Sequence, residues 1–169
     1  MSNKRGFREQ YETLLLVGEG ETEVAFLSHV KALYAPRGCG LAIKVFCARG
    51  KGAAHVVDVA IRQRLNAAYD TVAVLLDTDT DWGPAVAKRA NDHGIEVLRS
   101  EPMFEAMMLR VHRQRSTGRA EELKRRFARL VNGDGLDQRN YSTHFGDDIL
   151  QMARVREATL DHLLRLLHR

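Results

Sequence analysis

The chain has 169 residues, 44% of them hydrophobic and 28% charged, which suits one domain with a buried core and excludes a disordered chain. Its longest apolar run, Val72–Leu76, is far shorter than the ~20 residues of a membrane-spanning helix. Residues 1–10 are charged and lack the apolar stretch of a secretory signal, so we expect no membrane association and a cytoplasmic protein. The net charge is +4, but the stretch from Arg110 to Arg129 alone carries eight basic and two acidic residues.

Hydrophobic periodicity predicts alternating strands and helices in the first two thirds of the chain. The predicted strands cover residues 13–17, 41–47, 72–76 and 95–98. The predicted helices between them cover about 22–34, with Thr22 as N-cap, 54–68 and 83–93. This order indicates an α/β fold, a four-stranded parallel sheet flanked by helices.

Everything after residue 102 reads as helical, at about 103–112, 119–131 and 147–167. The last of these carries a leucine stripe at helical spacing, which fits a core face or the interface of a homo-oligomer. We expect a core over residues 13–110 and a C-terminal helical extension over 111–169, packed together as a single compact domain.

Charged side chains gather in three loops that follow the first three predicted strands. The loops hold Glu19, Glu21 and Glu23; Arg49, Lys51 and His55; and Asp77, Asp79 and Asp81. In a parallel α/β sheet these loops share the carboxyl edge, where ligands bind. For Glu19 and Asp77 to share one pocket, the strand order must be 2-1-3-4. Acids crowded at one edge repel one another unless a cation lies among them, and an all-oxygen donor set suits Mg²⁺ or Mn²⁺.

Competing interpretations fit these loops less well. A dinucleotide-binding loop would need its third glycine where Glu23 stands, and a calcium loop would need glycine at Trp82 and glutamate at Lys88. A lone Asp-x-Asp after a strand is often only a turn or a helix cap. The joint occurrence of acids after the first and third strands favours a metal site. In an extended segment, Asp77, Asp79 and Asp81 would also point to the same side.

Three stretches resemble TOPRIM proteins of the RloB-like and OLD-like branch. Leu14–Tyr34 (LLLVGEGETEVAFLSHVKALY) is similar to a strand ending in Glu-Gly with the pattern EGxTExxF, and Val74–Trp82 (VLLDTDTDW) resembles the acidic DxD. Glu101–Leu109 (EPMFEAMML) is similar to the RloB-like NPxFExWLL. Together they span about residues 13–110. The resemblance implies a TOPRIM-like, Rossmann-like core with divalent-metal phosphodiester chemistry, often in restriction or phage-defence loci beside an ABC-type ATPase partner.

The resemblance also assigns residues by position. Glu19 takes the place of the family glutamate, Asp77 and Asp79 take the DxD, and Glu105 takes the acid of the Phe-Glu element. Two positions depart from the pattern: Met107 replaces the family tryptophan, and no lysine follows Lys124. Either Arg139 or His144 substitutes for that lysine, or the activity is altered or lost.

From these observations we expect a Mg²⁺- or Mn²⁺-dependent nuclease. Glu19, Asp77 and Asp79 would be catalytic, with Glu23 and Glu105 as further metal ligands and Glu19 acting as ligand or general base. Nucleic acid, DNA or RNA, would bind the basic residues Arg49, Lys51, Arg113, Arg115, Arg126 and Arg129. Two alternatives stay open: a non-catalytic nucleic-acid- or nucleotide-binding subunit working with an ATPase, and an enzyme of small-molecule phosphotransfer.

Overall fold

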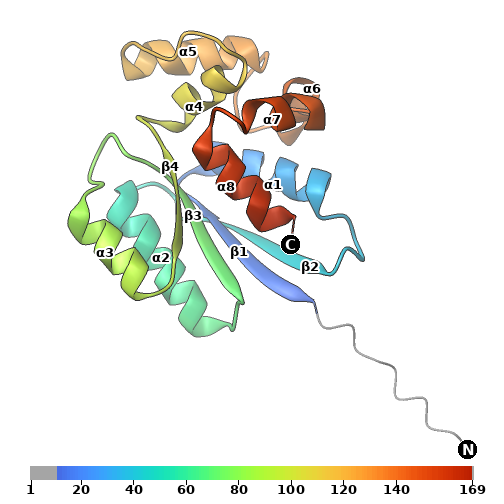
Figure 1. Ribbon diagram of the computed structural model, residues 1–169. Helices are drawn as coiled ribbons and strands as arrows, with labels where there is room; N and C mark the ends of the chain where they lie inside the picture. Colours follow the sequence, from blue (N-terminus) through green and yellow to red (C-terminus); the bar gives the residue numbers. More distant parts are fainter. Residues whose placement is uncertain (1–10, 169) are drawn as a thin grey trace, which may run out of the picture.

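The structure, a computed structural model, describes residues 11–168 (Figure 1). Strands and helices alternate first, in the order β1 (Glu12–Gly18), α1 (Glu21–Tyr34), β2 (Leu41–Cys47), α2 (Gly52–Asn66), β3 (Thr71–Asp77), α3 (Pro84–Asp92) and β4 (Glu96–Ser100). Five helices follow: α4 (Phe104–Val111), α5 (Ala120–Leu130), α6 (Gln138–His144), α7 (Asp147–Ala153) and α8 (Ala158–Leu167). The predicted α/β fold is confirmed, and no helix among the described residues is long and apolar enough to cross a membrane.

The four strands are parallel and lie in the order β2-β1-β3-β4, as predicted. Gly18, at the end of β1, is in register with Leu75 of β3, so the loops that leave these two strands start side by side. The chain can connect parallel neighbours only by crossing over the sheet, which is why a helix follows each of the first three strands.

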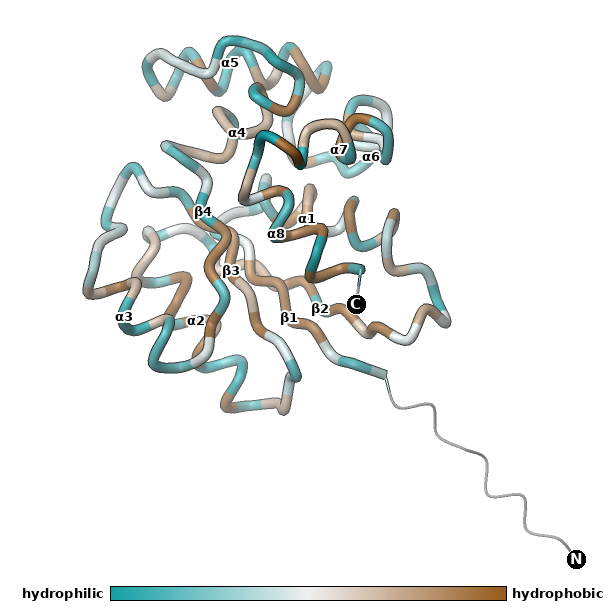
Figure 2. The backbone as a smooth tube through the Cα atoms, viewed as in Figure 1, coloured by the Kyte–Doolittle hydropathy of each residue, from teal (hydrophilic) through white to brown (hydrophobic). Residues whose placement is uncertain are grey.

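Alternate side chains of the strands pack into two separate hydrophobic cores, one on each face of the sheet. Leu14 and Leu16 of β1 face α1 and the C-terminal helices, while Leu15 and Val17 face α2 and α3. Both faces of β1 and β3 are therefore buried, which explains their continuous apolar sequence. In Figure 2 the strands form the hydrophobic centre of the molecule, between two layers of helices.

The C-terminal part differs from the sequence-based prediction in two places. The expected helix over 147–167 is wrong, because α7 ends at Ala153 and α8 begins at Ala158. Between them Glu157 is buried and forms an ion pair of 2.8 Å with Arg110 of α4. The second difference is α6, which was not predicted. Its Tyr141 is fully buried and packs against Phe26 of α1 with ring centroids 5.7 Å apart.

Candidate metal centre

Hydrogen bonds to backbone amides anchor three carboxylates at the carboxyl edge of the sheet. Glu19 Oε2 accepts a hydrogen bond of 2.9 Å from the amide of Asp77, which ties the end of β1 to the end of β3. Asp77 Oδ1 accepts one of 2.8 Å from the amide of Phe104, the first residue of α4. Glu23 Oε2 accepts one of 3.0 Å from the amide of Gly20, which is the N-cap of α1 in place of the predicted Thr22.

Burial and mutual repulsion act on these anchored acids. Burial raises the pKa of Asp77 from 3.8 to about 8, and the charges of Glu23, Glu19 and Glu105 add to the rise. Burial likewise raises the pKa of Glu23 from 4.5 to about 7, against its backbone hydrogen bonds and with a further contribution from Glu105 and Glu19. The charges that act on Asp77 and Glu23 come from acids on different elements, so we treat Glu19, Glu23, Asp77 and Glu105 as one acidic cluster.

Glu105 completes this cluster from the first turn of α4. Burial raises its pKa, the charge of Lys124 lowers it, and that of Asp79 raises it. The charge of Glu105 also contributes to the raised pKa of Asp77, which agrees with the expectation that Glu105 lies on the side of the acidic pocket. Lys124 belongs to α5, which packs against α4, and sequence reasoning gave it no role at the site.

Asp77 is the last residue of β3, and the two aspartates that follow it have different surroundings. Asp79 is exposed, and its negative charge raises the pKa of Glu105. Asp81 instead accepts hydrogen bonds from the amides of Ala53 (2.6 Å) and Ala54 (3.2 Å), at the start of α2. The expectation that it points to the same side as Asp77 is wrong, because the free amides of the α2 N-terminus offer it donors. Gly52 permits this contact, since a Cβ there would lie 2.6 Å from Asp81 Oδ1 at a φ of +84°.

The basic loop between β2 and α2 borders the acidic cluster. Gly50 donates a backbone hydrogen bond of 2.7 Å to the carbonyl of Glu19, so the loop is attached beside that residue. Arg49 and Lys51 are exposed and both adopt left-handed backbone angles, with φ of 62° and 72°. Left-handed angles are costly for residues other than glycine, and such conformations concentrate at functional sites.

The basic residues of the α4–α5 region divide into exposed and engaged groups. Arg113, Arg115 and Arg129 are exposed. Arg126 does not turn outward as expected. Its guanidinium forms an ion pair with Glu122 and donates hydrogen bonds to the carbonyls of residues 115 and 117, which fixes the turn before α5.

The donors of the acidic cluster match the chemistry of a divalent cation. Glu19, Glu23 and Asp77 each use one oxygen for a backbone amide, and within residues 11–168 no other residue donates to the second oxygen. No three Asp, Glu, His or Cys side chains in that range form a ready-made metal site. Mg²⁺ does not need one, because it commonly takes one or two carboxylates and completes its shell with water and substrate phosphates.

Comparisons of this chain with protein families, with curated proteins and with solved structures found no match. Sequence reasoning named Glu19, Glu23 and Asp77 because they lie in or beside loops at one edge of the predicted sheet, and it named Glu105 from the family resemblance alone. It missed Lys124, whose place depends on how α5 packs over α4. Lys124 is exposed, and no local sequence signal distinguishes it from the other exposed basic residues of α5.

Proposed function

We propose that this protein is a divalent-metal-dependent phosphodiester hydrolase that acts on nucleic acid. The observation that carries the proposal is the cluster of Glu19, Glu23, Asp77 and Glu105, in which burial and repulsion raise the pKa of Glu23 to about 7 and that of Asp77 to about 8. Protonation or a bound cation relieves such repulsion, and a folded chain that keeps one buried and three half-buried acids together near neutral pH favours the cation.

The sequence resemblance to TOPRIM proteins of the RloB-like branch supports the same activity. The residues that carry the resemblance include Glu19, Asp77, Asp79 and Glu105. The charges of Glu19 and Glu105, like that of Glu23, raise the pKa of Asp77, and the charge of Asp79 raises that of Glu105. The strand order β2-β1-β3-β4 agrees with a TOPRIM-like core. Phage defence beside an ABC-type ATPase is the setting that this resemblance favours.

In this proposal Asp77 and Glu19 hold the first ion, with Glu23 and Glu105 available for a second. A divalent ion supplies charge stabilisation for the attacking and leaving oxygens of a phosphodiester and lowers the pKa of bound water. The amides of Asp77 and Phe104 keep the two principal carboxylates oriented, so little reorganisation is needed when substrate arrives. Glu19 is a ligand or the general base that takes a proton from water.

Cations at the rim neutralise the substrate. Arg49 and Lys51 belong to the loop attached beside Glu19, and the charge of Lys124 of α5 lowers the pKa of Glu105. A phosphodiester that approaches the acids would otherwise meet only negative charge. Arg113, Arg115 and Arg129 extend the basic surface beyond the site, as a polymeric substrate requires.

A nuclease panel tests the proposal. Labelled single- and double-stranded DNA and RNA are incubated with the full chain in Mg²⁺, Mn²⁺ or EDTA, with and without a co-encoded ATPase if one exists. We expect metal-dependent cleavage that Asp77→Asn abolishes. Binding without cleavage by the wild type, under every metal and with the ATPase, would support the non-catalytic alternative. Turnover of mononucleotides or sugar phosphates alone would indicate small-molecule phosphotransfer.

A further inference from the structure

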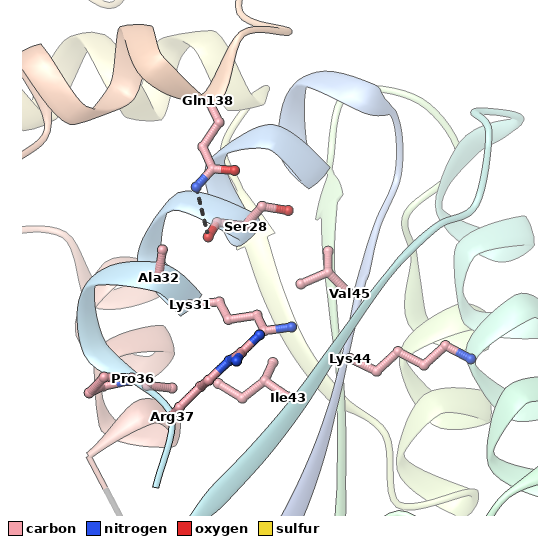
Figure 3. A pocket seen from close by; sticks show the side chains of 10 residues that line it. Ser28, Lys31, Ala32, Pro36, Arg37, Ile43, Lys44, Val45 and Gln138 are labelled. Carbon is pink, nitrogen blue, oxygen red and sulfur yellow. Dashed lines mark hydrogen bonds between the residues drawn. The ribbon is translucent and has the colours of Figure 1, made fainter. Parts of the chain in front are cut away.

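A groove runs along the outer edge of β2, away from the acidic cluster. Its main hollow, of about 670 Å³, lies between this strand and the C-terminal half of α1 (Figure 3). A second hollow of about 470 Å³ shares Lys31, Arg37 and Ile43 with the first and continues along the strand to Leu41. We call the two together the β2 groove. A stretch of five strand residues is about 16 Å long, which suits an extended chain.

The strand that floors the groove has one unpaired edge. Among the described strands β2 pairs only with β1, where Glu12 donates to the carbonyl of Gly40 and Ala48 donates to the carbonyl of Gly18. Residues with even numbers therefore direct their backbone groups to β1. Ile43 and Val45 lie between them, so their N–H and C=O groups face the groove.

The charged lining of the groove has one sign. Lys31 and Arg37 point into it from the α1 side, and Lys44 leaves the strand on the other side (Figure 3). No aspartate or glutamate lines either hollow. None of the three cations forms an ion pair within the described residues, which span positions 11–168. The occupant should therefore be anionic.

Backbone chemistry separates the classes of anionic occupant. A nucleic acid offers phosphates but no row of N–H groups for the carbonyls of Ile43 and Val45. The main hollow is lined by Ala32, Pro36 and other aliphatic side chains and by no aromatic residue, and Tyr11 is the single aromatic side chain lining the second hollow, so successive bases find no row of stacking partners among the described residues. A second copy of β2 would bring its own Lys44 and repel. An acidic polypeptide offers backbone groups that can pair with Ile43 and Val45 and carboxylates that can pair with the cations.

We propose that the β2 groove binds an acidic segment of a partner protein, which adds to the sheet as a fifth strand beside β2. Its backbone pairs with Ile43 and Val45, and carboxylates on alternate residues, which share one face of the added strand, meet Lys31 and Arg37. This inference goes beyond the proposed hydrolase and does not depend on it.

The test uses a fluorescein-labelled seven-residue peptide of alternating glutamate and valine, with a lysine-for-glutamate peptide as control. Fluorescence anisotropy on the full chain should detect binding of the acidic peptide only. The double variant Lys31→Glu/Arg37→Glu should weaken its affinity at least about tenfold. Arg62→Glu reverses an exposed charge on α2 and should change the affinity by less than about twofold.

Two further measurements report strand addition itself. Val45→Pro removes an outward N–H and leaves the β1-facing groups of β2 in place, so it should also abolish binding while the chain stays folded. In the wild type, amide exchange at Ile43 and Val45 should slow when the peptide is added, a readout that holds even if the proline variant unfolds.

Three results would overturn the proposal. One is no binding of the acidic peptide above the control, and another is binding without slowed exchange at Ile43 and Val45. The third is displacement of the peptide by a single-stranded oligonucleotide of equal charge, provided that the binding of this oligonucleotide is lost in Lys31→Glu/Arg37→Glu and unchanged in Val45→Pro. That pattern would assign the groove to nucleic acid.

Discussion

The carboxylate of Glu19 accepts a hydrogen bond of 2.9 Å from the backbone amide of Asp77, although the two residues are 58 positions apart in the chain. The bond crosses from the end of β1 to the end of β3 and holds two acidic loops together. Repulsion between their carboxylates would otherwise drive the loops apart. One oxygen of Glu19 therefore has a structural task, and the other is left for a ligand.

Two substitutions of Glu19 separate these tasks. Glu19→Gln keeps an oxygen acceptor for the Asp77 amide, so we expect near wild-type stability with loss of metal-dependent cleavage. Glu19→Ala leaves that amide without its partner and should cost about 1 kcal/mol of unfolding free energy in addition. Chemical denaturation and the cleavage assay measure the two effects. Equal stability of both variants would show that the hydrogen bond does not hold the loops.

Asp77→Asn should stabilise the metal-free protein, and more so at high pH. The folded-state pKa of Asp77 is raised from 3.8 to about 8, so between these values the folded state binds more protons than the unfolded state. The free energy of unfolding therefore falls as the pH rises through this window. Asparagine carries no charge and still offers an oxygen to the Phe104 amide.

The gain should be on the order of 1–3 kcal/mol at pH 8 and smaller at pH 5, with Tm rising by about 2–4 °C for each kcal/mol. Thermal unfolding in EDTA at both pH values measures it. Asp79→Asn is the matched control, because that side chain is exposed and should leave Tm unchanged. A lower Tm for Asp77→Asn at pH 8 would identify the ionised carboxylate as a structural cap.

Asp81→Ala should destabilise the fold without removing catalysis. Its carboxylate accepts from the amides of Ala53 and Ala54, and losing a cap of this kind costs about 1 kcal/mol. Cleavage per folded molecule should persist, since Asp81 points to α2. Loss of activity in a fully folded Asp81→Ala variant would place this residue among the metal ligands.

The exposed arginines of α5 should set the salt dependence of nucleic-acid binding. Arg125→Ala/Arg129→Ala removes two exposed cations and should reduce the slope of log affinity against log salt by roughly one to two units. Arg62→Ala/Lys88→Ala removes two exposed cations elsewhere and should leave the slope unchanged.

Arg126→Ala tests the other group of arginines. Because Arg126 holds the turn before α5 through the carbonyls of residues 115 and 117, its loss should lower Tm more than it changes the salt slope. The opposite result, a changed salt slope with an unchanged Tm, would show that Arg126 contributes to nucleic-acid binding.

The sequence was sufficient for the sheet because each strand is an apolar run next to a turn, and the acids follow those runs directly. The sequence was insufficient where tertiary contacts determine the helix boundaries and the surroundings of a side chain. The break before α8 depends on the ion pair between Glu157 and Arg110, and α6 is held by burial of Tyr141 rather than by an apolar period. Lys124 and Arg126 are two positions apart in the sequence, and it is the packing of α5 that gives them different surroundings.

Calorimetric titration of Mn²⁺ at pH 7, in two buffers of different ionisation enthalpy, tests the central claim most directly. Asp77 and Glu23 are partly protonated at this pH, so a cation among the carboxylates must displace protons. We predict binding accompanied by proton release, with both lost in Asp77→Asn. Absence of binding, or binding that releases no protons and survives Asp77→Asn, would contradict the assignment of this cluster as a metal centre.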